Sequence, residues 1–524
     1  FYKSTWSAET QSAGFFWLAR LACRRGDYEE ALEYIEKSLI RNWHNMKGRT
    51  LKAAILRKFG VDSTAFVKDC LEIDPLSQGC LYEQAAATDN YDLWLKTMRT
   101  ESHNFKELAQ EYIEAGLYED AIRILEACPQ KDPICWYTIG YVYTQLKEGE
   151  KEAFENGEKS CPDYCFPNRV EEIRILNAAI EALPQAPMAH YYLGNLLYDK
   201  KQYEEAASHW ETAVKEKEDL SPAYRNLAIY YYNKENDAPK ALEVMEKACA
   251  LDPEYPRIWL EYDQLAARMN LPVEKRLEIM ESHPAVTAGR DDLYLRYLTL
   301  LNDVGRYQEA LDGLGSRQFH PWEGGEGKVS SQYKYALIHL AMAKLDEKQP
   351  QEALKLLEAT LSYPNNLGEG KLPNVPDNEA HYYMGLAYKQ LGETQKAEKY
   401  FRLAASGPQE PGSVLYYNDQ PSDFIYYQGL ANLELGLDHA AKKSFHQLQT
   451  FGEQHLFDEV EYDFFAVSLP EIEVFQEDLK LRNVQYCNYL RALGHLGLGE
   501  NEKAGELLKE ILAKQSDYQG ALGR

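Results

Sequence analysis

The sequence has few of the features of a metal-binding or redox protein. Its nine cysteines are scattered over 524 residues, and the pattern Cys-x-x-Cys does not occur. The closest two, Cys161 and Cys165, lack a second pair at zinc-finger spacing, and no His-x-x-x-His sequence stands beside a third ligand. We therefore expect buried thiols in a reducing compartment, no metal site and no cofactor.

Positive charge and long apolar runs are also scarce. The chain carries 83 acidic residues against 57 Lys and Arg, a formal net charge of −26, which argues against nucleic acid or an anionic membrane as the main partner. No run approaches the roughly 18 apolar residues of a membrane-spanning helix, and there is no secretory signal. Because the first residue is Phe1 rather than Met, we expect a piece of a longer protein, so the missing signal says nothing about the N-terminus of that parent. The thiols expected in a reducing compartment favour a cytoplasmic protein.

Nucleotide-binding and catalytic patterns are missing as well. Neither Gly327-Lys328 nor Gly370-Lys371 is followed by Ser or Thr, which excludes a P-loop. The neighbouring acids Asp291-Asp292 precede a predicted helix, where helix capping explains them, and no nucleophile stands beside a general base. We expect a non-catalytic chain, while a longer parent protein with a further domain leaves catalysis open.

A turn followed by a helix recurs along the chain. In residues 26–31, Gly-Asp-Tyr-Glu-Glu-Ala, acidic residues fall in the first helical turn, where they complement the helix dipole. Each motif follows a helical segment with a small central residue, such as Gly194. Ala206 and Ala241, which end two of the motifs, are 35 residues apart, close to the roughly 34-residue tetratricopeptide period. The copy that ends at Ala241 is weaker, and further similar turns end at Ala121, Ala310 and Ala397.

By this pattern the chain resembles the tetratricopeptide repeat (TPR) family over most of its length. The resemblance implies an all-α fold, a TPR-type α-solenoid in which helical hairpins stack into a right-handed superhelix. We expect partly degenerate N-terminal repeats over 1–160 and a main array over 169–524. Loop insertions are expected in the main array at 315–331, 362–379, 406–422 and 452–478.

Two glycine-rich loops interrupt the repeats. The sequence Gly-Glu-Gly-Lys occurs at 325–328 and again at 368–371, 43 residues later. Because equivalent loops of neighbouring repeats emerge on the same edge of a solenoid, we expect the two loops side by side. The tryptophan at 322, with Glu, Lys, His and Asn nearby, suits stacking on and hydrogen bonding to a sugar or a peptide end. The alternative is that Trp322 only fills a packing gap. The candidate binding residues of the loops are His320, Trp322, Glu323, Glu326, Lys328, Asn366, Glu369 and Lys371.

A narrower resemblance rests on longer stretches of sequence. These stretches are residues 225–228, 231–234, 290–294, 319–328 and 363–372. Through them the chain resembles the C-terminal TPR region of mostly bacterial proteins whose N-terminal half is a β-sandwich domain of unknown function, related to sugar-active proteins. The resemblance implies that the two loops contact that missing domain, or a carbohydrate-type ligand.

A peptide-binding groove is the alternative function. Asn195 and Asn226 match two asparagine positions of the clamp with which some TPR domains bind a peptide C-terminus. The lysine expected three residues before Gly194 is Tyr191, so the match is partial. Under this alternative the concave, tyrosine-lined face binds a separate protein partner and the glycine-rich loops are structural. Both interpretations describe an interaction scaffold.

Overall fold

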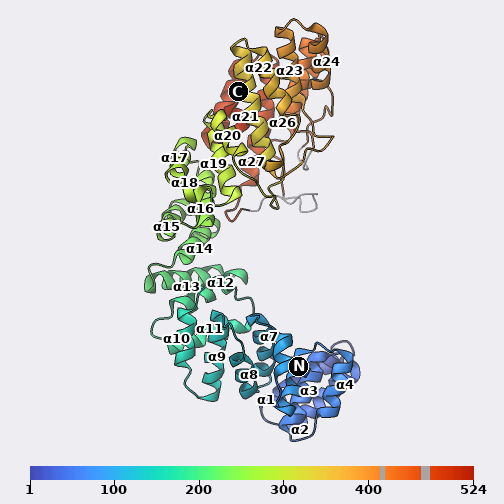
Figure 1. The fold of residues 1–524 in the computed structure, drawn as a ribbon, viewed down its shortest axis with the longest axis vertical. Coiled ribbons are helices and arrows are strands. Elements are labelled where there is room, and N and C mark those ends of the chain that lie inside the picture. The colour runs from blue at the N-terminus through green and yellow to red at the C-terminus, as the bar shows by residue number, and fades with distance from the viewer. Residues whose placement is uncertain (413–418, 462–472) are drawn as a thin grey trace. The chain divides into compact units, whose positions relative to one another are not determined.

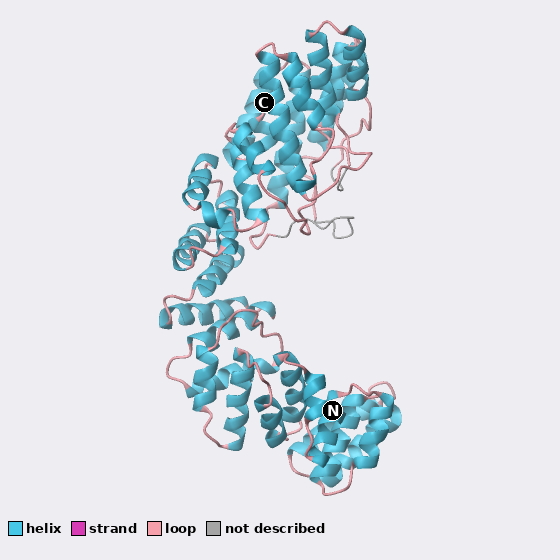
Figure 2. Ribbon diagram, viewed as in Figure 1, coloured by secondary structure: helices cyan, strands magenta, loops and turns pink. Residues whose placement is uncertain are grey.

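The computed structural model describes residues 1–412, 419–461 and 473–524. Every regular element in these ranges is a helix and none is a strand (Figure 2), which confirms the all-α prediction. The described chain forms two compact units, Phe1–Ala223 and Tyr224–Arg524.

The first unit consists of consecutive helical hairpins (Figure 1). The boundary between the two predicted arrays, at residues 160–169, lies between helices α10 and α11 of this unit. The elements are η1 (Tyr2–Trp6), α1 (Gln11–Arg24), α2 (Tyr28–Arg41), α3 (Met46–Lys58), α4 (Thr64–Ile73), α5 (Gln78–Thr88), α6 (Asp92–Met98), α7 (Ser102–Glu114), α8 (Tyr118–Glu126), α9 (Pro133–Leu146), α10 (Lys151–Lys159), α11 (Glu171–Ala182), α12 (Pro187–Asp199), α13 (Tyr203–Glu216) and the start of α14 (Ser221–Tyr230).

The second unit contains the candidate loops. The loop that starts at Ser316 joins α20 to α21, and a second long loop joins α22 to α23. Parts of the predicted insertions 406–422 and 452–478 fall outside the described residues. After α14 the elements are η2 (Tyr231–Glu235), α15 (Ala238–Leu251), α16 (Pro256–Arg268), α17 (Val273–Ser282), α18 (Pro284–Thr287), α19 (Asp291–Asp303), α20 (Tyr307–Gly315), α21 (Lys328–Asp346), α22 (Pro350–Ala359), η3 (Asn365–Leu367), α23 (Asn378–Gln390), α24 (Thr394–Ala404), α25 (Phe424–Glu434), α26 (Asp438–Gln454), α27 (Leu479–Gly497), α28 (Asn501–Lys514) and α29 (Gln519–Leu522).

The recurring motif explains how each hairpin turns. In the first copy Gly26 has a φ of 78°, which glycine adopts without strain, and the side chain of Asp27 then caps α2 by accepting the N–H of Glu30 at 3.1 Å. Ala31, which ends the motif, is fully buried where α2 packs on α1. The motif therefore encodes a turn, a cap and a close helix contact.

Small residues at the centre of the first helix make room for an aromatic ring from the second helix. A Cβ atom on Gly194 of α12 would lie 2.5 Å from the ring of Trp210 of α13, and one on Gly385 would lie 2.5 Å from Phe401. Both rings are nearly completely buried. Glycine thus allows the two helices of a hairpin to pack closely around a large apolar side chain.

Two later segments of the second unit pack back onto its earlier helices. Asn233 donates to the carbonyl of Val474 at 2.7 Å, and Phe475 is buried against the ring of Tyr232. Further along, the N–H of Ser516 donates to Asn270 at 2.6 Å. These contacts join residues more than 200 positions apart, so the inner side of this unit is lined by several distant segments.

Candidate binding site

The two glycine-rich loops contact one another directly. The backbone N–H of Phe319 donates to the carbonyl of Asn366 at 2.7 Å. The side-chain amide of Asn366 donates to the carbonyls of Leu314 and Arg317, at 2.8 and 2.9 Å. Asn366 therefore caps the end of α20 and fixes the second loop beside the first, as the repeat spacing predicts.

Glu369 connects the second loop to the helix that follows the first. Its carboxylate accepts the N–H of Gly327 at 3.0 Å and the hydroxyl of Ser330 at 3.1 Å. Gly327 is the N-cap of α21, so the negative charge lies where the helix dipole and the unpaired N–H groups favour it. The predicted ligand Glu369 is thus engaged in holding the loops together.

Lys371 also has partners within the protein. Its ammonium group donates to Asp377 at 2.6 Å and to the carbonyl of Thr360 at 3.3 Å, and Lys334 donates to the same Asp377 at 3.0 Å. Burial lowers the pKa of Lys371, against the attraction of Asp377. Three of the predicted loop ligands, Asn366, Glu369 and Lys371, therefore stabilise the loop pair.

His320 and Glu323 lie on the outer side of the first loop. The His320 side chain is 78% exposed, and both its Nδ1 and its backbone nitrogen lie within 3.0 Å of Asp291 Oδ2. Glu323 is exposed. Asp291, expected to cap α19, instead anchors this loop, since it also pairs with Arg317 at 2.5 Å.

The remaining loop residues face a cavity of about 600 Å³ in the second unit. Trp322, Glu326 and Lys328 contribute to its wall from the loop and from the start of α21. The opposite walls come from α19, α23, the start of α25 and the segment near Asp517. The cavity is therefore lined by residues from several repeats.

Trp322 both packs and lines this cavity. Its ring lies against the backbone of Gly325, where a Cβ atom would come within 2.2 Å of the indole, and it contacts the apolar cluster that includes Phe319 and Leu367. The indole Nε1 is shielded from solvent and has no hydrogen-bond partner among the described residues. Packing accounts for the ring's position, and leaves its N–H group unpaired.

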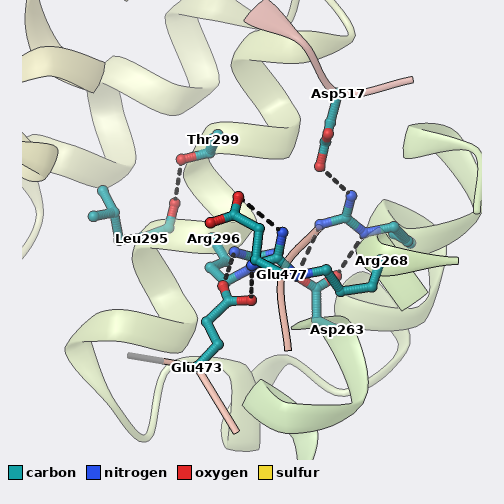
Figure 3. Close-up of polar contacts among 9 residues, drawn as sticks. Asp263, Arg268, Leu295, Arg296, Thr299, Glu473, Glu477 and Asp517 are labelled. Atoms are coloured by element: carbon teal, nitrogen blue, oxygen red, sulfur yellow. Dashed lines mark hydrogen bonds and ion pairs between the residues drawn. The ribbon is translucent and has the colours of Figure 1, made fainter. Parts of the chain in front are cut away.

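The basic groups of the cavity are balanced by buried acids. Arg276 forms two hydrogen bonds with Asp263, at 2.8 and 2.9 Å, and a third with Asp517 at 2.6 Å. Arg296 also bonds Asp263. Figure 3 shows Glu473 beside Arg296, close to Asp263. Burial disfavours the charge of Asp263, yet the two arginines outweigh it and lower its pKa to about 2.

Lys328 is the basic residue that the first loop adds to this wall. Burial, reinforced by repulsion from Arg296, lowers the pKa of Lys328 to about 8. The glutamates Glu473 and Glu326 favour its charged form to a smaller extent. Lys328 therefore titrates nearer to neutral pH than an exposed lysine does.

Two acidic groups of the cavity have raised pKa values although positive charges lie near them, Arg276 and Arg296 near Asp303 and Arg524 near Asp423. Asp303 accepts the amide of Gln519 at 2.8 Å, while its Oδ2 has no hydrogen-bond partner among the described residues. Burial and repulsion from Asp517 raise the pKa of Asp303 to about 7. Burial and the neighbouring Glu379 raise the pKa of Asp423 to about 6. Within the described ranges neither Asp303 nor Asp423 forms a salt bridge.

These acids are functional candidates that sequence reasoning missed. Asp303 ends α19 and Asp423 precedes α25, positions where an acidic residue reads as an ordinary surface or capping group. They come together only because repeats more than 100 residues apart face the same cavity. The sequence carried no local signal for them.

The two asparagines of the proposed peptide clamp are each hydrogen-bonded. Asn195 accepts the indole N–H of Trp210 at 3.0 Å, and Asn226 accepts Nη1 of Arg225 at 3.1 Å. Asn195 belongs to the first unit and Asn226 to the second. Their side-chain oxygens therefore have partners within the protein.

Metal clusters, disulfides and membrane-spanning helices are not found among the described residues. Among the described residues no group of three His, Cys, Asp or Glu side chains has metal-binding geometry. All nine cysteines are free thiols and eight are buried, Cys161 being the exposed one. Within the described ranges, no helix has the length and apolar character needed to cross a membrane.

Comparison with protein families identifies the repeats. Tetratricopeptide repeat models match residues 18–42, 187–220 and 339–411. The chain thus contains tetratricopeptide repeats, and its helical hairpins form the scaffold-type fold of TPR interaction proteins.

Solved structures that resemble the chain include proteins of very different length. The TPR protein YrrB, described as having an unusual peptide-binding site, is 16% identical over 43% of this chain and 95% of its own, with a TM-score of 0.18. Yeast Tom70 is 12% identical over 98% of this chain and 95% of its own, with a TM-score of 0.30. A chain of the Naa15/Naa10 structure bound to HypK-THB is 16% identical over 97% of this chain and 77% of its own, with a TM-score of 0.24.

Proposed function

We propose that the protein is a non-catalytic interaction scaffold whose second unit binds a segment of a protein partner in the cavity beside the first glycine-rich loop. The observation that carries this proposal is the cavity of about 600 Å³ that Trp322, Lys328 and several helices of that unit line. TPR hairpins present such inner faces to extended peptides, and shape and polar contacts there decide the partner.

The loop pair gives the cavity a rigid edge. Asn366 and Glu369 fix the two loops with four hydrogen bonds. The loop that carries Trp322 is therefore ordered by contacts within the protein. A pre-ordered aromatic wall lowers the entropic cost of binding. The glycine-rich loops, expected to bind directly, act in this proposal mainly by positioning Trp322 and Lys328.

The outer side of the first loop supports a second, separate contact. His320 and Glu323 are exposed there, beside the anchoring residue Asp291. In a longer polypeptide, a further domain or a carbohydrate-type ligand bound on this side would use these two residues. The resemblance to proteins with a sugar-enzyme-like β-sandwich motivates this candidate, which is independent of the cavity.

Selection from a peptide library tests the main proposal. A phage-displayed library of random dodecapeptides is selected on the full chain, on Ser331→Trp and on Gln308→Trp. Ser331 is exposed and lines the cavity, so a tryptophan there fills it, whereas the exposed Gln308 of α20 lies outside it. Peptides recovered with the wild type and Gln308→Trp but not with Ser331→Trp support the proposal.

Two results would overturn the main proposal. One is enrichment of the same peptides on all three proteins, and the other is recovery of no peptide at all. A glycan array on the same three proteins separates the ligand classes. A glycan whose binding is lost only in Ser331→Trp would place a carbohydrate, not a peptide, in the cavity.

A further inference from the structure

The charges around the cavity are unequal. Seven of its lining residues are acidic and four are basic. The acidic set is Asp292, Asp303, Glu326, Glu379, Asp419, Asp423 and Asp517, and the basic set is Arg276, Arg296, Lys328 and Lys334. Arg276, Arg296 and Lys334 pair with Asp263, Glu473 and Asp377, and two of the lining acids are also paired, Asp517 with Arg276 and Asp292 with Arg290. Acidic side chains therefore outnumber basic ones around the cavity.

Asp303 and Asp423, which form no salt bridge within the described ranges, line the same cavity. Repulsion from Asp517 helps to raise the pKa of Asp303, and repulsion from Glu379 helps to raise the pKa of Asp423. Tyr335 lines the same cavity, and burial raises its pKa, with smaller contributions from Tyr307, Asp303 and Glu379. The carboxylates thus share one region, where their mutual repulsion favours a bound cation.

Aromatic rings surround this acidic wall. Trp322, Tyr335, Tyr363 and Phe424 line the same cavity. A lysine or arginine side chain needs both elements, because its apolar stem packs on aromatic rings while its charged end meets a carboxylate. A simple metal ion would find no described cluster of ligands here.

The protein itself contains an example of the contact. The guanidinium of Arg524 lies 5.1 Å from the ring centroids of both Tyr426 and Tyr427, and donates to the Tyr427 hydroxyl at 2.7 Å. Glu379 accepts that same hydroxyl. One face of this acidic and aromatic wall therefore already accommodates an arginine.

The cavity continues beyond the acids. A second cavity of about 420 Å³ shares four wall residues with the first, and these are Thr299, Pro421, Asp423 and Asp517. Asp423 thus lies where the two spaces meet. A ligand that reaches both is extended, as a peptide segment is, rather than a small ion.

We propose that the segment bound in this cavity carries a lysine or arginine, whose cationic end is received between Asp303 and Asp423. The inference rests on the proposed peptide-binding function and adds the chemistry of the partner. It requires a basic residue in an otherwise extended segment, flanked by residues that pack on Trp322 and Phe424. An acidic peptide C-terminus, by contrast, meets an excess of carboxylates.

The test uses the peptides selected in a cavity-dependent manner. They are expected to share an Arg or Lys at one position. A synthetic fluorescein-labelled copy of the most enriched peptide is then compared with the same peptide carrying citrulline for Arg, or norleucine for Lys. Fluorescence anisotropy is expected to show at least tenfold weaker binding of the uncharged peptide to the wild type.

Protein variants assign that difference to the two acids. In Asp303→Asn/Asp423→Asn the charged and uncharged peptides are expected to bind within about threefold of one another. Asp312→Asn removes the same charge from an exposed site outside the cavity, and should keep the tenfold difference. The single variant Asp423→Asn, expected to show a partial loss, provides the same comparison if circular dichroism shows the double variant to be unfolded.

Failure of the inference differs from failure of the proposed function. Cavity-dependent peptides without a shared basic residue would overturn the inference and leave peptide binding intact. A tenfold preference for charge that persists in the Asn variants would likewise place the cation elsewhere. Loss of all cavity dependence would overturn both.

Discussion

Glu369 accepts the backbone N–H of Gly327 at 3.0 Å, across 42 residues of sequence. The contact joins the second glycine-rich loop to the first turn of α21, the helix that supplies Lys328 and Ser331 to the cavity. It places a carboxylate at the positive end of a 19-residue helix. The loops are thus coupled to the cavity through a helix terminus.

Substitution Glu369→Gln is expected to loosen this terminus. The amide retains hydrogen-bonding capacity but loses the charge, at a cost of about 1 kcal/mol. Hydrogen exchange followed by mass spectrometry should show faster exchange in peptides covering residues 325–331. Glu352→Gln, at an exposed first-turn position of α22, is the matched control and should leave those peptides unchanged.

Alanine substitutions of two glycines in the second loop test the packing of the loop pair. Gly368 has a φ of 83°, and a Cβ atom there would lie 2.6 Å from the carbonyl oxygen of Phe319, whereas a Cβ on Gly370 meets nothing within 4 Å. Gly368→Ala is expected to destabilise the loop pair by about 2–3 kcal/mol, through backbone strain and the clash. Gly370→Ala should change it by less than about 0.5 kcal/mol.

Urea unfolding followed by tryptophan fluorescence, with exchange rates near Phe319, measures the difference between the two glycine variants. Equal behaviour of the two would mean that the loops are not packed as described. Because both changes add one methyl group to neighbouring loop positions, any general effect of alanine cancels in the comparison.

The helical architecture and the pairing of the loops were predictable from local patterns. The motif ending in Ala31 specifies a turn, a cap and a buried contact within six residues, and a 43-residue offset places equivalent loops on one edge. The cavity was not predictable in the same way. Asp303 and Asp423 are 120 positions apart, and their burial depends on how many hairpins intervene and how those hairpins pack.

The roles of the loop residues could not be predicted from the sequence either. Composition alone grouped Trp322, Asn366 and Lys371 as ligands, yet two of the three bond neighbouring carbonyl or carboxylate groups. A polar residue in a loop serves a ligand or the loop's own backbone equally well. Which of these roles it has depends on distances in the folded protein, and the spacing of residues in the sequence does not give them.

Asp303 gives the second unit an unusual dependence on pH. Its pKa is about 7 in the folded protein and near 3.8 when unfolded, so the folded state binds the extra proton between these values. Stability is therefore expected to fall as pH rises from about 4 to 7 and to change no further above that range. Asp303→Asn should remove this loss, and gain on the order of 2–4 kcal/mol relative to the wild type between pH 5 and pH 8.

Urea denaturation of both proteins at pH 5 and pH 8 measures this gain from Asp303→Asn. Asp312→Asn, which removes an exposed carboxylate, should show the same pH dependence as the wild type. A parallel pH profile for Asp303→Asn and the wild type would show that the carboxyl group is charged throughout. The buried Oδ2 would then need a partner beyond the described residues.

Arg276 is expected to be the most costly single charge to remove. Its side chain is 3% exposed and links Asp263 of α16 to Asp517, which lies 241 positions after Arg276. Arg276→Gln leaves Asp517 without this partner and Asp263 with Arg296 alone, so about 3–5 kcal/mol of stability should be lost. Arg306→Gln, which breaks more exposed pairs with Glu281 and Glu309, should cost no more than about 1 kcal/mol. Hydrogen exchange in residues 513–520 should accelerate in Arg276→Gln only, because Arg276 holds that segment through Asp517. Equal exchange rates in the two variants would assign the docking of the segment to Asn270 and Gln519 instead.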